Sequence, residues 1–258
     1  MASEATQGAT PGASIPSLKE RRQRYRQETV DAILAAARVV MQEQGVAALN
    51  LNEVARRLGV SGQALAKYFP SKSALYDALF LLGHRLFREA EAEIWRTTAP
   101  DWQRIHRWFE DRLALACEHP DLYQLIWDVP VPGLTYTEAR KEESHAMITA
   151  ARRGFQEVVD AGHLHAGMPV ERVVDILMAM RHGIIAEHLG KRDHLPPGSD
   201  RFRGLIPDVL AIFEQAWGGT RQHSSRTTDD TSPTRRAGGK EGGSTKSIPP
   251  TDPRIYGA

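Results

Sequence analysis

Residues 49–75 read LNLNEVARRLGVSGQALAKYFPSKSAL, and this stretch decides the fold of the N-terminal part of the chain. Two short helical patterns are joined by a turn that contains Gly59, and a third helix begins directly after Pro70. The apolar residues of the first pattern have the i, i+3, i+4, i+7 spacing of a helix with one buried face, and they are Leu51, Val54, Ala55 and Leu58. This layout is that of a helix-turn-helix, whose second helix enters the major groove of DNA.

The first helix of this motif carries signals at both ends. Asn50 is the expected N-cap, and Glu53, three residues later, is expected to reach back and complete a capping box. Gly59 follows the last apolar residue, where a left-handed residue commonly ends a helix. We expect Val60 to fill the turn from the core side.

The second helix is predicted over residues 62–69. Ser61 is its expected N-cap, and Pro70 stops it because proline cannot continue the backbone hydrogen bonds. Leu65 and Phe69 are the expected buried pair. The remaining side chains are then left for DNA.

Each exposed residue type of this helix has a chemistry that suits DNA. Glutamine can pair with adenine, lysine can bind guanine or phosphate, and alanine can touch the methyl group of thymine. A tyrosine hydroxyl can donate to phosphate. The residues that we expect to contact DNA are Asn50, Ser61, Gly62, Gln63, Ala64, Lys67, Tyr68 and Lys72.

Two further basic features lie outside the second helix. Lys72 stands in the first turn of the helix capped by Ser71, where a cation opposes the helix dipole, so a phosphate partner is the expected reason for it. Residues 19–26 hold five basic residues against one acidic residue. Through Arg22 and Arg24 this arm could follow phosphates or enter the minor groove. The alternative is a solvated, disordered arm.

The motif resembles the N-terminal signature of the TetR family of bacterial regulators over about residues 27–76. The matching residues are Val54-Ala55, Gly59-Val60-Ser61, Leu65, Tyr68-Phe69-Pro70-Ser71-Lys72 and Ala74-Leu75. Two positions depart, because the family usually has threonine and tyrosine where this chain has Ala64 and Ala66. The tyrosine often contacts the DNA backbone, so the departures preserve the fold but leave the operator sequence unpredictable.

Composition fits one or two globular domains. The chain has 258 residues, of which 41% are hydrophobic, and a formal net charge of only +1, so its basic residues act locally. A single cysteine, Cys117, excludes an internal disulfide and is expected to be a buried thiol. No apolar run approaches the ~18 residues of a membrane span, and residues 1–18 lack a signal core. We therefore expect a cytoplasmic protein.

Between polar ends, the sequence reads as entirely helical. We expect a disordered N-terminal arm (1–18), a DNA-binding domain (19–76), a helical regulatory and dimerisation domain (77–218) and a disordered tail (219–258). Apolar periodicity, caps and Pro/Gly breaks predict helices over about 23–44, 72–97, 102–118, 121–127, 137–161, 170–190 and 202–217. The fold class is therefore all-α.

The resemblance implies that the last two helices form a homodimer. The apolar residues that would make this interface are Val173, Leu177, Met180, Ile184, Leu205, Val209, Ile212, Phe213 and Trp217. A dimer would also double the base contacts of one short helix, at half-sites ~34 Å apart in a palindromic operator. Residues 118–123 and Arg181-His182-Gly183 resemble a subgroup with a Trp-His-Gly signature, although arginine replaces its tryptophan.

The resemblance further implies a pocket for a small effector, expected to be apolar. Our candidate lining residues are Trp108, Tyr123, Trp127, Met147 and His182, and the alternative is that they fill an ordinary core. The histidines show no spacing typical of a metal site, and no catalytic motif occurs. We expect no metal, cofactor or catalytic residue.

The leading hypothesis is a homodimeric repressor that binds double-stranded DNA and is released by a small molecule. An activator or an effector-independent regulator of the same fold is an alternative. A second alternative is a sequestering protein with a vestigial DNA head, which the alanines at positions 64 and 66 motivate.

Overall fold

The computed structural model describes residues 17–128, 131, 137–191 and 201–219. All of them belong to one compact unit. The regular elements of this part of the chain are helices, which confirms the all-α fold class, and one isolated backbone bridge joins Leu164 to Gly218. The predictions for residues 1–16 and 220–258 lie outside the described residues.

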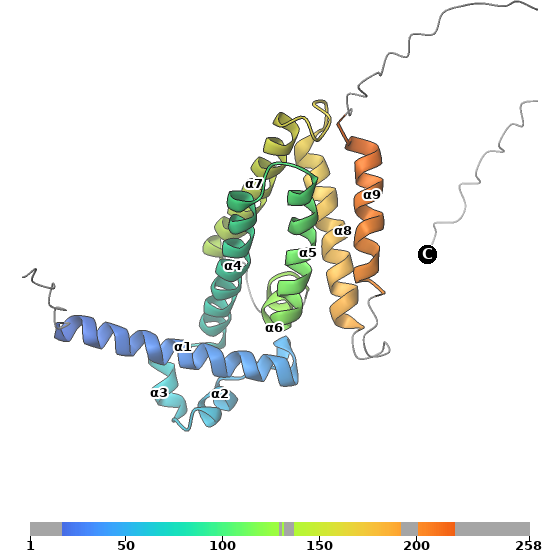
Figure 1. Cartoon of the computed structure of the whole chain (residues 1–258). Coiled ribbons are helices and arrows are strands. Elements are labelled where there is room, and N and C mark those ends of the chain that lie inside the picture. The colour runs from blue at the N-terminus through green and yellow to red at the C-terminus, as the bar shows by residue number, and fades with distance from the viewer. Residues whose placement is uncertain (1–16, 129–130, 132–136, 192–200, 220–258) are drawn as a thin grey trace, which may run out of the picture. The chain divides into compact units, whose positions relative to one another are not determined.

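The N-terminal helices surround a small core. They are α1 (Leu18–Gln44), a 3-10 turn (Val46–Ala48), α2 (Leu51–Arg57) and α3 (Gly62–Ala66), followed by α4 (Lys72–Thr97) (Figure 1). The fully buried side chains of this region include Ala37, Val40, Leu49, Val54, Leu65 and Leu75. Helix α1 begins five residues earlier than predicted, because Ser17 and Glu20 form a capping box at its start.

The remaining helices continue from α4. They are α5 (Trp102–Glu118), α6 (Pro120–Tyr123), a π-helical turn (Gln124–Asp128), α7 (Glu138–Asp160), α8 (Val170–Gly190), a 3-10 turn (Arg203–Leu205) and α9 (Ile206–Trp217). The predicted 121–127 segment is therefore an α-turn followed by a π-turn. The last helix begins later than predicted, since its first turn is 3-10.

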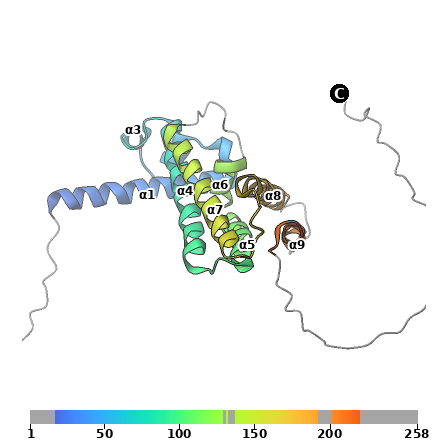
Figure 2. The same ribbon diagram turned by 90° about the horizontal axis from the view of Figure 1, so that it is seen from above.

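Helix α4 belongs to both halves of this unit. Near its start Leu75 and Leu79 are buried with the N-terminal helices, and further along Phe87 and Ile94 are buried in the second half. Figures 1 and 2 show α7 beside α4, and α9 beside α8. The single cysteine, Cys117, is half-buried on α5 rather than fully buried. A long helix shared by both halves gives a direct mechanical connection between them.

Candidate nucleic-acid interface

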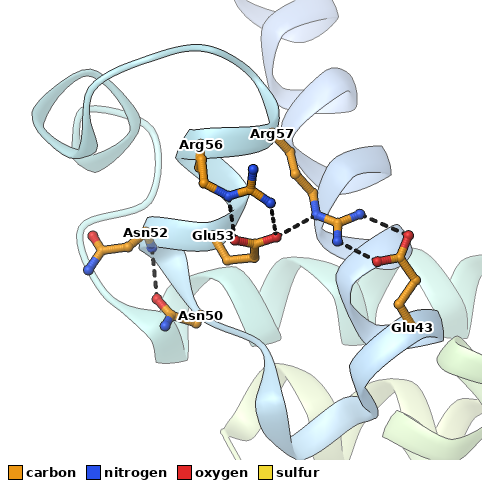
Figure 3. Close-up of polar contacts among 6 residues, drawn as sticks. All are labelled: Glu43, Asn50, Asn52, Glu53, Arg56 and Arg57. Carbon is orange, nitrogen blue, oxygen red and sulfur yellow. Dashed lines mark hydrogen bonds and ion pairs between the residues drawn. The ribbon is translucent and has the colours of Figure 1, made fainter.

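The first helix of the motif, α2, is held by a polar network rather than by the predicted capping box (Figure 3). Asn50 does cap it, because its side-chain oxygen accepts a hydrogen bond from the Asn52 N–H at 2.9 Å. The Glu53 carboxylate does not reach back. It accepts two bonds from Arg56 at 2.8 and 2.7 Å and one from Arg57 at 2.9 Å. Charge-assisted bonds to two guanidinium groups outweigh one bond to a backbone N–H.

The same network ties α2 to α1. The Arg57 guanidinium donates to both carboxylate oxygens of Glu43 on α1, in one case at 3.1 Å (Figure 3). Hydrogen bonds from Arg56 and then Arg57 lower the pKa of Glu53 to about 2. Arg57 is therefore committed to the fold, whereas the Arg56 side chain remains largely exposed.

The turn of the motif is closed by backbone hydrogen bonds. Gly59 has φ +66°, the left-handed conformation that glycine adopts without strain. The Gly59 N–H donates to the Arg56 carbonyl at 3.2 Å, and the Val60 N–H donates to the Ala55 carbonyl at 3.0 Å. The expectation that Val60 fills the turn from the core was wrong, because these bonds already close it and the Val60 side chain is 43% exposed.

Helix α3 is shorter than predicted. Ser61 caps it by accepting from the Ala64 N–H at 3.2 Å, and Leu65 and Phe69 are buried as expected. The α-helix ends at Ala66, and the chain then turns so that the N–H groups of Tyr68 and Phe69 both donate to the Leu65 carbonyl. The prediction of a helix through residue 69 was wrong, because the Tyr68 N–H donates to a carbonyl three residues back instead of four and so ends the α-helical pattern.

The outer side of α3 carries most of the predicted DNA contacts. Ser61, Gly62, Gln63 and Lys67 are exposed, and Ala64 and Tyr68 are half-buried. The guanidinium of Arg26 on α1 lies 5.4 Å from the centre of the Tyr68 ring. Gln63 and Lys67 have no side-chain partner among the described residues, so their hydrogen-bonding groups are available to bases and phosphates.

Lys72 has a local partner that the sequence did not reveal. Its Nζ donates to the Ala47 carbonyl at 3.2 Å and lies 5.4 Å from the centre of the Tyr76 ring. The argument that only a phosphate explains this lysine was therefore wrong, because the cation satisfies a carbonyl that leads into α2. The Lys72 side chain remains exposed and can still bind DNA.

The basic arm is a helix, and its two candidate residues lie on different faces. The core side of α1 carries Ile33 and Val40, and Arg26 and Arg22 precede them by seven and eighteen residues, which are about two and five helical turns. Arg22 therefore extends the face of α1 that packs on the motif. Arg24 lies elsewhere on the helix and pairs with Glu28 at 3.7 Å. The N-terminal half of α1 extends past α3 (Figures 1 and 2).

Most of the predicted pocket residues belong to the core instead. The Tyr123 hydroxyl and His182 Nδ1 form a hydrogen bond of 2.8 Å, and the Tyr123 and Trp127 rings pack 4.9 Å apart. Trp108 is buried beside a void of only about 10 Å³. Met147 lines a larger cavity, one of about 210 Å³ between α4 and α7. We predicted that these aromatic residues line a pocket, because the sequence alone does not distinguish side chains that line a cavity from side chains that fill a core.

The predicted dimer residues divide into two groups. Val173, Leu177, Ile184 and Phe213 are buried within the chain itself, so they are not available to a second copy. Leu205 and Ile212 are exposed, and Val209 is half-buried. Met180 of α8 is exposed as well, and Trp217 is half-buried. Ile176 of α8, which was not among the candidates, is also exposed.

A polar link between α1 and α6 was also missed. The buried Asp121 carboxylate accepts from Arg38 and from Gln42, both on α1. Asp121 lies in the 118–123 segment that carried part of the family resemblance. Nothing in the sequence identified its partners, because they lie about eighty residues away in the chain.

The described part of the chain shows two further limits on function. No three His, Cys, Asp or Glu side chains within it converge as a metal site would require. None of its helices combines the length and apolar character needed to cross a membrane.

Comparison with known proteins agrees with this geometry. Residues 33–79 match the sequence model of the family described as bacterial regulatory proteins, tetR family. The sequence matches none of the curated proteins. Among solved structures, the chain is similar to a TetR-family transcriptional regulator from Agrobacterium tumefaciens, with 17% identity over 72% of this chain and 98% of that chain and a TM-score of 0.60.

Two other solved structures are similar over comparable lengths. One is the SmeT–triclosan complex, with 19% identity, a TM-score of 0.57 and coverage of 81% of this chain and 100% of that chain. The other is NalD, the secondary repressor of the MexAB-OprM multidrug efflux pump in Pseudomonas aeruginosa, with 18% identity, a TM-score of 0.54 and coverage of 76% and 98%. At these identities the likeness is one of fold.

A helix-turn-helix with an exposed second helix, continued by a helical domain, defines a DNA-binding transcriptional regulator. Residues 33–79 carry the DNA-binding motif of the tetR family of bacterial regulatory proteins, and the chain shares the fold of a solved TetR-family regulator. Proteins of this family are transcription factors and not enzymes.

Proposed function

We propose that the protein is a homodimeric repressor that a small molecule releases from a palindromic operator. The observation that carries the proposal is the outer side of α3, where Gln63 and Lys67 are exposed and without side-chain partners in the described part of the chain. The position of α3 is fixed by the buried side chains of Leu65 and Phe69 and by the Ser61 cap. We assign residues 19–76 to DNA binding and residues 77–218 to regulation and dimerisation.

The exposed apolar residues of α8 and α9 support a dimer. Four of the eight large hydrophobic residues that are exposed in the described chain lie there or in the turn before α9: Ile176 (49%), Met180 (37%), Leu205 (43%) and Ile212 (62%). The two helices lie side by side (Figures 1 and 2). A second copy covering this face would bury it and place a second α3 in the next major groove, ~34 Å away. The interface that we propose thus uses Leu205 and Ile212 with Ile176 and Met180.

Two connections can carry a signal from the regulatory half to the motif. One is α4, which runs continuously from Lys72 to Thr97. The other is the contact of Asp121 with Arg38 and Gln42 on α1. An effector that prefers one arrangement of these helices would shift the population away from the DNA-binding form. The repressor NalD and the triclosan-bound SmeT share this fold, which supports the proposed mode of action.

A titration against DNA at several salt concentrations tests the proposal. The purified protein should bind its own upstream intergenic fragment as a dimer and much more tightly than a scrambled fragment. Gln63→Ala should weaken the specific complex by about 1–3 kcal/mol and relax specificity at one base pair. Gln103→Ala, an exposed glutamine on α5, is the matched control and should change neither. Equal and strongly salt-dependent binding to both fragments would contradict the proposal, because it would reflect phosphate attraction alone.

A sequestering protein without operator recognition is the second candidate. Ala66 favours it, because this exposed methyl group cannot make the backbone contact for which the family usually has a tyrosine. Retained effector binding without specific DNA binding would support this candidate. The assignment to the Trp-His-Gly subgroup also stays a proposal.

A further inference from the structure

A hollow runs between α4 and α7. The cavity of about 210 Å³ that Met147 lines shares Arg88, Ala92, Ala150 and Arg153 with a wider groove of about 880 Å³. The groove has a volume suited to small molecules, whose sites span ~300–1,000 Å³, and the cavity deepens it. The two helices that form the walls pack side by side (Figures 1 and 2).

The inner wall of this hollow is apolar. It is formed by Trp95, Met147, Ala92 and Ala150. The Trp95 ring lies so close to α7 that a Cβ atom at Gly154 would be 2.5 Å from its Cε3. The Trp95 Nε1–H is buried and has no acceptor in the described part of the chain. A ligand here would meet an apolar surface with one unused hydrogen-bond donor beside it.

The carboxylates that face the cavity are already neutralised. Glu91 accepts from the Trp108 indole N–H and pairs with the buried Arg112 guanidinium. Glu157 pairs with the buried Arg104 at 2.6 Å. Neither carboxylate therefore needs a cationic ligand.

The rim, by contrast, carries one cation without a carboxylate partner in the described chain. Arg153 has no carboxylate partner among the described residues, whereas Arg88 pairs with Glu143 at 3.6 Å. Lys141 and His145 also line the groove, while Glu142 is its one carboxylate. The Lys141 ammonium is itself paired with Glu138 at 2.7 Å. The cation at the mouth that is free to pair with a ligand is thus Arg153.

The protein interior behind this wall is also positive. The Arg181 guanidinium is buried, lies 3.4 Å from the centre of the Trp108 ring and donates to the Trp108 carbonyl at 3.0 Å, without a carboxylate partner in the described chain. Burial, followed by repulsion from Arg112, lowers the pKa of Arg181 to about 9. Two buried guanidinium groups therefore share the single carboxylate of Glu91. In a region of low dielectric constant this surplus attracts an anion.

We propose that the hollow between α4 and α7 binds an anionic molecule with an apolar body, of the class of medium-chain carboxylates. The carboxylate would pair with Arg153 at the rim, and the chain would lie against Trp95 and Met147. The role of such a ligand as effector rests on the proposed function. The sequence led us to expect an apolar effector, and this proposal adds that the effector also carries a negative charge.

Calorimetric titration of the full chain without DNA tests this assignment. The probes are decanoate, decanol and decylammonium, each below the concentration at which it forms micelles, because they differ only in the head group. Decanoate should bind about tenfold more tightly than decanol, and decylammonium should bind most weakly. Equal or tighter binding of the alcohol or the ammonium compound would overturn the proposal, as would no binding of decanoate.

A pair of variants locates the charge. Arg153→Gln should weaken decanoate binding by about three- to tenfold and leave decanol binding unchanged, because only the charged head group loses its partner. Arg85→Gln removes an exposed arginine of α4 that does not line the hollow, so it should leave both unchanged. Equal effects of the two variants would show attraction by net charge alone and contradict the site. A protein that binds decanoate in this way but no operator would contradict the proposed function and leave this inference standing.

Discussion

The Arg38 guanidinium on α1 donates two hydrogen bonds to the Asp121 carboxylate on α6, from Nε to Oδ2 at 2.8 Å and from Nη2 to Oδ1 at 3.1 Å. The Asp121 side chain is fully buried, whereas that of Arg38 is partly exposed. Gln42 donates to the same carboxylate at 3.1 Å, and His119 Nδ1 lies 3.0 Å from Arg38 Nη2. The contact fixes the direction in which the start of α6 meets the DNA-binding half.

Asp121→Asn should destabilise the protein, because a neutral amide cannot accept both bonds from the guanidinium. We expect a loss of about 1–3 kcal/mol in the free energy of unfolding, measured by chemical denaturation. Asp111→Asn is the control, since Asp111 pairs with Arg107 on the surface and should cost less than about 1 kcal/mol. Similar losses in both variants would show that the α1–α6 contact stabilises the protein no more than a surface ion pair does.

His84 should make stability depend on pH. Its ring is 1% exposed, and neither nitrogen has a partner within the described chain. Burial, followed by repulsion from Arg112, Arg88 and Arg140, lowers its pKa from 6.5 to about 4. The unfolded chain therefore binds the proton first, so stability is fully present above pH 6.5 and falls as the pH drops toward 4. The loss is at most about 3.5 kcal/mol at ~1.4 kcal/mol per pH unit.

Comparison with His84→Leu isolates this contribution. The difference in unfolding free energy between the two proteins should change between pH 6.5 and 4 and be constant above that range. Parallel curves throughout would mean that His84 is protonated in the native state as easily as in the unfolded chain.

Arg22→Gln and Arg24→Gln should differ in their effect on DNA binding, although both remove one positive charge from the same helix. Arg22 extends the packed face of α1 in line with Arg26, which contacts Tyr68, whereas Arg24 pairs with Glu28. If the helix follows phosphates beside the operator, Arg22→Gln should reduce the salt slope by about one unit. Arg24→Gln should leave the slope nearly unchanged. Equal slopes for both variants would count against an oriented contact.

Gly154→Ala should disturb the wall between α4 and α7. The added methyl group would meet the Trp95 ring at 2.5 Å, and this rigid ring lies between helices that cannot separate without loss of packing. We expect a destabilisation of about 1–3 kcal/mol in thermal or chemical unfolding. Gly183→Ala on α8 is the control, because nothing lies within 4 Å of the position of its Cβ. An unchanged stability of Gly154→Ala would show that Trp95 can move freely.

Local signals in the sequence predicted much of the fold. The caps at Ser61 and Ser71 and the break at Gly59 placed helices that the structure confirms, and α4 has its predicted bounds. These signals succeed because each depends on residues within a few positions of one another. Glu53 shows where they fail. Its carboxylate was predicted to accept from the backbone N–H of the cap residue, but it accepts from the guanidinium groups of Arg56 and Arg57 instead. The Arg57 guanidinium is also bound to Glu43 of another helix.

The dimer interface and the ligand pocket were harder to predict, because they too depend on contacts between residues that are far apart in the sequence. Helix α8 has apolar residues around much of its circumference, so periodicity alone did not separate Leu177, which is buried, from Met180, which is exposed. Likewise, the aromatic residues chosen as a pocket wall, such as Tyr123, contact one another and His182. Charge and volume between α4 and α7 depend on how two helices far apart in the sequence pack.

The side chains that fix α3 and those that face away from the core are different residues. Leu65, Phe69 and the Ser61 cap hold the helix in place, whereas Gln63 and Lys67 take no part in packing or in hydrogen bonds among the described side chains. Substitutions at these two outward positions should therefore cost little stability. Mutation can alter the DNA sequence that such a protein prefers without first unfolding it, which makes operator preference an evolvable and engineerable property of this scaffold.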